Sequence, residues 1–284
     1  METKSCQNCK KDFTIETEDF KFYEKINVPP PTFCPHCRMI RRMSFGNLFK
    51  LYKRACDRCG QSVVCLYPPD KKCRMYCQPC WWKDDWDGTE YGMDYDPARP
   101  FFEQLIELRE RSPFQSLESL YPSLVNTKYT NNASYQRNCF MTIYADFDEH
   151  CAYSVMLANT KDLLDCYRAK ESELCYECVG VYKCYNCKWS EELENCVDCF
   201  FCQSCYGCTN CLGCVNLRGA SYQIFNVQYS KEEYFEKLKE MKLETYADQQ
   251  QIKEQAEEFW LKAPKREYHG NSLNKNVTGE YIYE

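Results

Sequence analysis

The second half of the chain repeats small or apolar side chains with a period of three. Every third residue from Cys151 to Ala220 is small or apolar, and charged side chains occupy only the positions between them. This period is neither the ~3.6 of an amphipathic helix nor the ~2 of a half-buried strand. A 3₁₀-helix of this length is not stable, and polyproline II requires a regularity in Pro or Gly that the segment lacks.

Turn-forming residues often stand directly before the repeating position, as at Asn186, Asn195 and Gly207. Such residues suit a tight corner at each step. We therefore predict a cysteine-rich parallel β-solenoid over 126–229, with a coil of roughly 18 residues made from six steps. Its cysteines either pack as small apolar groups, bind further metal ions within 175–214, or act as redox-active thiols. Packing is favoured, because crowded thiolates would repel one another.

Other segments predict small α elements around this mainly β chain. Residues 84–125 read as an aromatic linker with a short amphipathic helix that ends at Pro113. Ser230 and Glu233 form a capping box that opens one long helix over 230–262. The tail, 263–284, has β character and is expected to begin a further coil, which would make this chain a short or truncated example of its kind.

Four CxxC pairs stand near the start of the chain. Each pair places two sulfur atoms on one tight turn, and two pairs complete a tetrahedral zinc site. We predict a double four-cysteine zinc module over 1–83, of the zinc-ribbon or treble-clef kind, with a small β-hairpin over 12–26. The expected ligands are Cys6, Cys9, Cys34 and Cys37 in one site, and Cys56, Cys59, Cys77 and Cys80 in the other.

Two further cysteines, Cys65 and Cys73, compete as ligands of the second site, whereas His36 is interpreted as a bystander. A module this small cannot offset its chain entropy with buried apolar surface alone. A structural zinc ion contributes roughly 10–16 kcal/mol, so the metal should hold the module together. Four protein ligands leave no open position for water, and hydrolytic zinc chemistry is therefore not expected.

Cysteine makes up 24 of the 284 residues, so the redox compartment matters. The first residues contain no secretory signal, and no apolar run approaches the ~20 residues of a membrane span. These patterns predict a protein of the reduced cytoplasm, without a membrane partner, whose cysteines bind metal or pack.

The net charge of −6 hides a basic segment, since residues 33–83 hold 11 Lys and Arg against Asp57 and Asp70. Arginine forks contact phosphates and exposed aromatic rings stack on unpaired bases, which suggests a nucleic-acid surface. The alternatives are charge balance for the zinc thiolates and a protein-docking surface. The basic residues with matching helical spacing are Arg38, Arg41, Arg42, Lys50, Lys53 and Arg54.

Enzymatic activity and a small-molecule substrate are not predicted. The histidines are scattered, and no Gly-rich phosphate loop or serine-nucleophile motif is present. The most catalytic-looking patch is Asp146, Asp148, Glu149 and His150, which we interpret as a solvated loop.

Several motifs resemble known sequences. Cys6-x-x-Cys9, Phe13 and the Pro-rich approach to Cys34-Pro35-His36-Cys37-Arg38 resemble the probable zinc-ribbon domain at the head of many bacterial proteins. With WWKDDWDGTEYG, FFEQL and CTNCLGCVNLRGASYQIFNVQYSKEEYFEKL, most of the chain resembles an uncharacterised cysteine-rich zinc-ribbon family of candidate-phyla bacteria. This resemblance implies metal binding and no catalytic residues.

The leading hypothesis is a non-enzymatic zinc protein that contacts nucleic acid or a ribonucleoprotein. The first alternative is a structural or protein-interaction scaffold built on the solenoid. The second is a metal- or redox-responsive protein.

Overall fold

The computed structural model describes residues 1–44, 46–241 and 243–264. The chain divides into two compact units, Met1–Leu51 and the residues from Tyr52 onward. The prediction of a mainly β chain with a parallel solenoid is confirmed. The predicted tail lies outside the described residues from position 265 on. The predicted zinc module spans the division, because its two cysteine clusters belong to different units.

The described residues of the first unit form one hairpin and two helices. Strands β1 (Glu2–Ser5) and β2 (Asp12–Ile15) pair antiparallel, followed by α1 (Thr17–Lys25) and α2 (Pro35–Met43). The predicted hairpin over 12–26 is wrong, because β2 pairs backward with β1 and the chain then turns helical. The physical reason is a capping box, in which Asp19 accepts a hydrogen bond from the Glu16 N–H at 3.1 Å and starts α1.

The second unit begins with a similar hairpin, β3 (Tyr52–Ala55) and β4 (Ser62–Cys65). Strand β5 (Arg74–Tyr76) leads into the short helix α3 (Gln78–Trp81) and the 3₁₀ turn η1 (Gly88–Tyr91). The predicted amphipathic helix is present as α4 (Phe101–Arg111).

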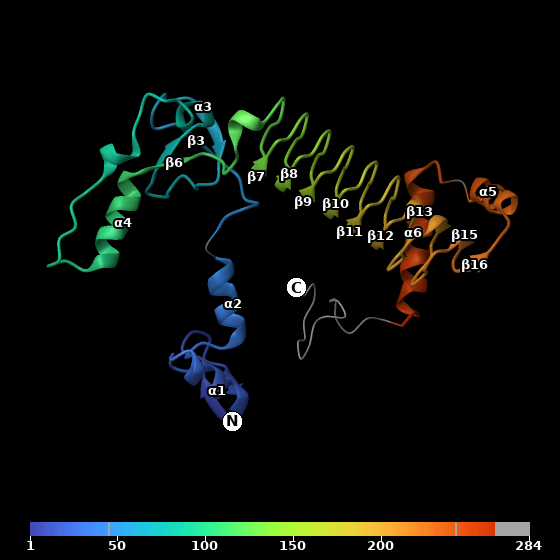
Figure 1. Ribbon diagram of the computed structural model, residues 1–284, viewed down its shortest axis with the longest axis horizontal. Coiled ribbons are helices and arrows are strands. Elements are labelled where there is room, and N and C mark those ends of the chain that lie inside the picture. The colour runs from blue at the N-terminus through green and yellow to red at the C-terminus, as the bar shows by residue number, and fades with distance from the viewer. Residues whose placement is uncertain (45, 242, 265–284) are drawn as a thin grey trace. The chain divides into compact units, whose positions relative to one another are not determined.

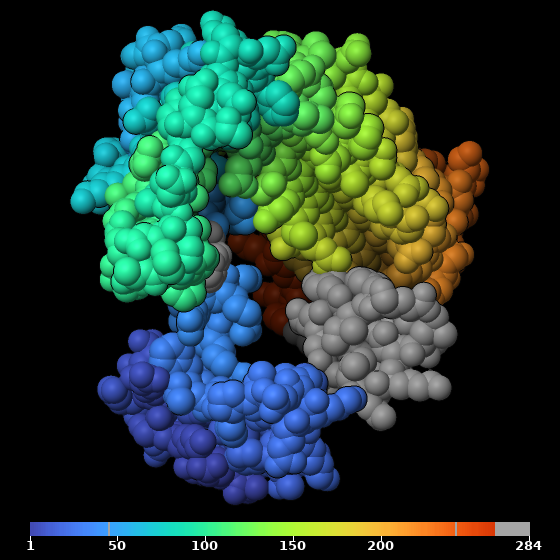
Figure 2. All heavy atoms as spheres, turned by 60° about the vertical axis from the view of Figure 1, so that its left-hand side comes forward, coloured from blue at the N-terminus to red at the C-terminus, as the bar shows by residue number. Residues whose placement is uncertain are grey.

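Strand β6 (Pro113–Gln115) then pairs parallel with β5 and joins this segment to the solenoid. A 3₁₀ turn, η2 (Tyr121–Ser123), precedes the first regular coil. The segment from β3 to β6 and the first coils form a continuous surface, cyan and green in Figure 2.

The solenoid stacks short parallel strands side by side (Figure 1). Its coil is twelve residues long rather than about 18, since Ile143 pairs with Val155 and Val155 pairs with Tyr167. The first sheet contains β7 (Asn131–Ser134), β8 (Ile143–Asp146), β9 (Val155–Ala158), β10 (Tyr167–Lys170), β11 (Val179–Tyr182) and β12 (Glu191–Glu194). The second contains β13 (Val197–Phe200), β14 (Thr209–Leu212), β15 (Ser221–Ile224) and the antiparallel β16 (Val227–Gln228).

A left-handed backbone residue forms each corner of the coil. Nearly every residue directly before an inward position has positive φ, as at Asn186 (50°), Asn195 (52°) and Gly207 (63°). Twelve residues with a corner every third residue make four sides, which explains the period of three. Even the bulky Trp189 adopts φ 48°. Such a backbone costs about 1 kcal/mol per non-glycine residue, so the coil-to-coil hydrogen bonds must offset it.

Hydrogen bonding explains why the inward residues are so often Cys, Ser or Thr. Where an inward residue carries a polar side chain, that side chain can accept the N–H of the inward residue twelve positions later. Cys166, for example, donates its N–H to Ser154 Oγ at 3.0 Å. The Cys166 thiol in turn donates to the carbonyl oxygens of Leu164 (3.4 Å) and Cys175 (3.5 Å). A small polar side chain therefore accepts a buried N–H that Ala or Val would leave unpaired, and its own hydrogen adds a bond to a carbonyl oxygen.

Two helices cover the last coils, α5 (Lys231–Glu240) and α6 (Tyr246–Leu261) (Figure 1). The capping box of Ser230 and Glu233 is confirmed, but the single long helix over 230–262 is wrong. Thr245 caps a second helix by accepting the Asp248 N–H at 3.2 Å. The break lets both helices bury apolar residues against the solenoid, namely Tyr234, Ile252, Ala256 and Trp260 on Phe201, Leu212, Val215 and Ile224.

The inward column continues upstream of Cys151 and includes a carboxylate. Asp148 is 2% exposed, and its Oδ1 accepts hydrogen bonds from the Thr160 N–H (3.0 Å) and hydroxyl (2.7 Å). Its Oδ2 accepts from Gln136 Nε2 at 3.1 Å. Burial raises the pKa of Asp148 above 3.8, although these bonds from Thr160 and Gln136 lower it.

This raised pKa predicts a pH dependence of stability. The folded state binds the proton of Asp148 more tightly than the unfolded state, so this carboxyl destabilises the fold increasingly as pH rises from about 3.8 through the raised pKa. Asp148→Asn removes this pH-dependent contribution to stability, because an asparagine side chain does not titrate. Thermal unfolding at several pH values should therefore give a difference in Tm, wild type minus variant, that falls as pH rises. The exposed Asp165→Asn serves as control, and an equal slope for both variants would contradict the assignment.

Candidate metal centres

The first cysteine cluster lies between the β1–β2 hairpin and the start of α2. The Sγ atoms of Cys6, Cys9, Cys34 and Cys37 lie within 4.8 Å of one another. The Sγ atoms of Cys9 and Cys34 are 3.8 Å apart. A tetrahedral zinc ion with Zn–S bonds of about 2.3 Å requires sulfur atoms about 3.8 Å apart. The cluster can therefore hold such an ion with little rearrangement.

The second cluster has the same construction. The Sγ atoms of Cys56, Cys59, Cys77 and Cys80 also lie within 4.8 Å of one another, and Cys59 and Cys77 Sγ are 3.8 Å apart. In each cluster the first pair occupies the turn of a hairpin, and the second pair lies at the N-cap and first turn of a helix.

The backbone conformations of the two clusters also agree. The residue after the first pair is left-handed in both, Lys10 at φ 62° and Gly60 at φ 73°. Cys34 and Cys77 are the N-caps of α2 and α3, with φ and ψ of −63° and 160°, and −65° and 160°. One local fold thus occurs twice in the chain, once in each unit.

Backbone donors favour thiolate in both clusters. The N–H of Cys34 donates to Cys6 Sγ, and the N–H of Cys77 donates to Cys56 Sγ, both at 3.2 Å. Although burial raises it, these and neighbouring N–H groups lower the pKa of Cys6 to about 6 and that of Cys56 to about 7. Asn8 lowers the pKa of Cys37, but burial and the neighbouring cysteines raise it to about 11, and burial raises the pKa of Cys77 to about 12. Cys6 and Cys56 are thus prepared as thiolates, and a bound cation would favour that form in the other cysteines.

The competing cysteines of the second site are used elsewhere. Cys65 is buried and donates its thiol to the Tyr67 carbonyl at 3.3 Å. Cys73 Sγ instead accepts a hydrogen bond from Arg54 Nη1 at 3.4 Å. Neither sulfur belongs to the second cluster, and His36 is exposed and outside the first.

The predicted basic residues do not share one unit. Arg41 and Arg42 are exposed on α2, where Arg38 is half-buried. Lys50 ends the same unit, whereas Lys53 and Arg54 lie on β3 in the other. Arg54 donates to the carbonyls of Lys71 (3.3 Å) and Cys73 (3.2 Å), so its guanidinium is engaged within the fold.

Lys53 lies at a pocket that the sequence did not reveal. The cavity, of about 530 Å³, is also lined by Lys128, Tyr121 and Tyr129 and by several hydroxyl groups. No carboxylate lies among the described residues that line it. Positive charge with exposed phenol rings suits an anionic, aromatic ligand such as a nucleotide. Only the fold brings Lys128 close to Lys53, so no local sequence pattern could have identified the pair.

The solenoid thiols do not gather as the two clusters do. Within the described ranges, the only groups of three or more Cys, His, Asp or Glu close enough to hold a metal ion are the two clusters. Cys199, Cys202 and Cys205 are fully buried and donate to backbone carbonyls. The structure thus uses these thiols as core side chains.

The acidic patch is dispersed rather than forming one loop. Asp148 points into the core, whereas Asp146 accepts a hydrogen bond from Ser134 on the outside of the coil. His150 lies at a corner, between Asn138 (2.9 Å) and Asp162 (3.3 Å).

Within the part of the chain that the structure describes, no helix has the length and apolar character needed to cross a membrane. The chain matches no family model and no curated protein.

Proposed function

We propose that this chain is a non-enzymatic zinc-binding protein that contacts single-stranded nucleic acid, free or within a ribonucleoprotein. Zinc is the preferred metal because four thiolates at tetrahedral spacing form a closed structural site. Such a site shapes a surface and leaves no position for a reacting water molecule. The zinc centres therefore position the basic residues that follow them.

The observation that carries the proposal is the composition of α2 and the segment after it. The run from Phe33 to Lys50 contains no acidic residue. Arg41 and Arg42 are exposed, and neither forms an ion pair with another described residue. Phe49 is 63% exposed in the same unit. Exposed guanidinium groups and exposed aromatic rings are both typical of surfaces that bind phosphates and stack bases.

The pocket at Lys53 and Lys128 offers a second contact in the other unit. Its two ammonium groups suit a phosphate, and the ring of Tyr129, which is 40% exposed, can stack on a base.

The test measures binding of a short single-stranded RNA by fluorescence anisotropy at several salt concentrations. Arg41→Gln/Arg42→Gln should weaken binding about tenfold and lower the slope of log K against log salt by about 1.4, because two phosphate contacts are lost. Zinc content should stay unchanged. The matched control is Lys239→Gln/Lys262→Gln, which removes two exposed cations from α5 and the end of α6. Equal affinity and slope in both double variants would refute the role of α2.

The scaffold alternative has its own support in the exposed aromatic rings on the solenoid. Tyr135 and Phe147 stack at 4.7 Å on successive coils, and both are more than half exposed. Such rings are enriched in protein interfaces. If the wild-type protein binds no RNA at low salt, this alternative becomes the better account.

A further inference from the structure

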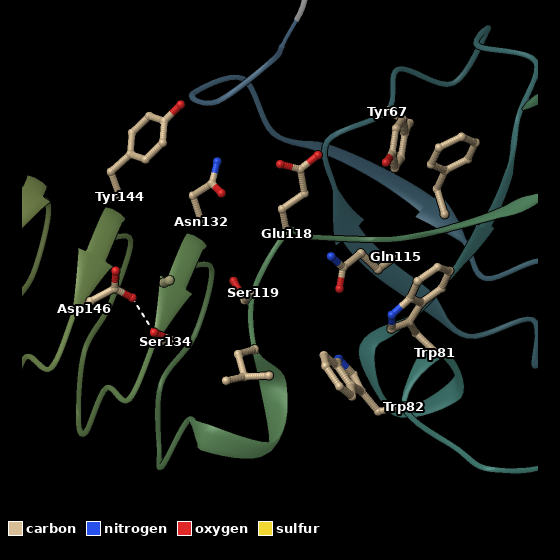
Figure 3. A pocket seen from close by; sticks show the side chains of 13 residues that line it. Tyr67, Trp81, Trp82, Gln115, Glu118, Ser119, Asn132, Ser134, Tyr144 and Asp146 are labelled. Carbon is tan, nitrogen blue, oxygen red and sulfur yellow. Dashed lines mark hydrogen bonds between the residues drawn. The ribbon is translucent and has the colours of Figure 1, made fainter.

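A second pocket lies in the unit from Tyr52 onward and shares Ser119 with the lysine pocket. It has a volume of about 700 Å³, within the range of small-molecule sites. Trp81 and Trp82, at the end of α3, form one side, and Tyr144 and Asp146 of β8 form the other (Figure 3). The segment that follows β6 contributes Glu118 between them.

The aromatic walls are held in place before any ligand arrives. Trp82 Nε1 donates to Gln78 Oε1 at 3.1 Å, which fixes the orientation of the indole. Trp81 packs on Trp86 with ring centroids 5.0 Å apart, and its carbonyl accepts the Trp86 Nε1–H at 3.0 Å. Because Trp82 is 39% and Tyr144 is 44% exposed, both still offer ring surface to a ligand.

The charged groups that line the pocket are both carboxylates. Glu118 and Asp146 are its two carboxylates, and no Lys or Arg lies among the described residues that line it. Ser134 donates a hydrogen bond to Asp146 and holds that carboxylate on the coil. Gln115 Oε1 is buried without a hydrogen-bond partner among the described residues.

Charge and shape together select the ligand class. Two carboxylates with no cation among the lining residues disfavour phosphates and other anions, although Arg109, which is not a lining residue, lies 5.9 Å from the ring centroid of Phe114. Indole and phenol faces attract cations through their negative ring surfaces, most strongly where a carboxylate is near. We propose that this pocket binds a small organic ammonium ion, with its alkyl groups against Trp82 and Tyr144 and its charge facing Glu118 and Asp146. The lining contains no residue of α2, so cation binding at this pocket can be tested separately from nucleic-acid binding.

Calorimetry and tryptophan fluorescence on the full zinc-loaded chain test the site with two probes. Choline represents a quaternary ammonium ion, and spermidine represents a polyamine. The probe that binds more strongly shows which of these two kinds of ammonium ion the pocket prefers. The specificity control is the uncharged alcohol in which a carbon atom replaces the choline nitrogen. At least one cation should bind at least tenfold more tightly than this alcohol, since the ring faces and carboxylates act on charge.

Variants separate this site from general charge attraction. Glu118→Gln/Asp146→Asn and Tyr144→Ala should each weaken the cation about fivefold or more. The matched controls, Asp165→Asn and Tyr153→Ala, remove an exposed carboxylate and an exposed tyrosine elsewhere on the solenoid and should leave affinity unchanged. Circular dichroism establishes that each variant folds. The proposal is overturned if neither cation binds, if the neutral alcohol binds equally well, or if controls and pocket variants lose affinity alike.

Discussion

Replacing Cys6 and Cys34 with serine is expected to unfold the unit Met1–Leu51. Among the described residues of this unit, the one buried cluster consists of Cys6, Cys34 and Cys37, with Phe13 and Phe33 packed against it. So small a core cannot offset the chain entropy of the unit. A structural zinc ion contributes roughly 10–16 kcal/mol of apparent binding energy, which is lost with its ligands. Hydrogen exchange should therefore show loss of amide protection throughout residues 1–51.

The control is Cys65→Ser/Cys73→Ser, which removes two thiols that lie outside both clusters. Elemental analysis should give two zinc ions per chain for this control and for the wild type, and one for the Cys6 and Cys34 variant. Protection of the solenoid amides should persist in all three, because the second cluster and the coils belong to the other unit. If exhaustive chelation leaves the amides of 1–51 protected, the four cysteines are ordinary packed thiols and the zinc assignment fails.

Replacing Cys202 with phenylalanine is expected to disrupt the solenoid. Its coil contains four cysteines as inward residues, all fully buried: Cys199, Cys202, Cys205 and Cys208. The preceding coil instead combines one leucine, Leu193, with three smaller side chains. Each coil thus encloses a limited volume. A phenyl ring exceeds it, at a cost on the order of 3 kcal/mol, and also removes the thiol that donates to the Phe200 carbonyl.

Two further substitutions make this prediction specific to the core. Cys202→Ser should be tolerated, because Ser190 occupies the equivalent position one coil earlier and accepts the Cys202 N–H at 3.0 Å. Ser204→Phe places the same ring two residues later, in the outward column that also carries Tyr144, and should cost under about 1 kcal/mol. Urea unfolding followed by far-UV circular dichroism measures all three. Equal destabilisation by the two phenylalanine variants would contradict the volume argument.

Local sequence patterns predicted those features that depend on neighbouring residues. Asn, Asp and Gly at many of the corner positions favour the left-handed backbone there, although Tyr, Phe, Met and Glu form other corners. The capping box at Ser230 starts α5 where expected. The same reasoning failed where a second local pattern was overlooked. Asp19 turns the expected hairpin into α1, and Thr245 divides the expected long helix.

The coil length could not be read from a period of three, because six corners repeat that pattern as well as four do. Strand register decides it, and register is a contact between residues twelve positions apart. Both pockets have the same origin. Trp82 approaches Asp146, and Lys53 approaches Lys128, only after β6 joins the second cysteine cluster to the coils.

By itself, the sequence determined which residues of the cysteine ladder face inward and which cysteines come together in each four-cysteine cluster. These features depend on side-chain chemistry over a few residues. Each CxxC pair, for example, brings two sulfur atoms onto one tight turn, where both can bind the same tetrahedral ion. Only the tertiary structure decided the number of sides of the coil, the separation of the two cysteine clusters into different units, and the side chains that meet in the pockets. Those outcomes depend on strand pairing and packing between distant segments, which no local pattern specifies.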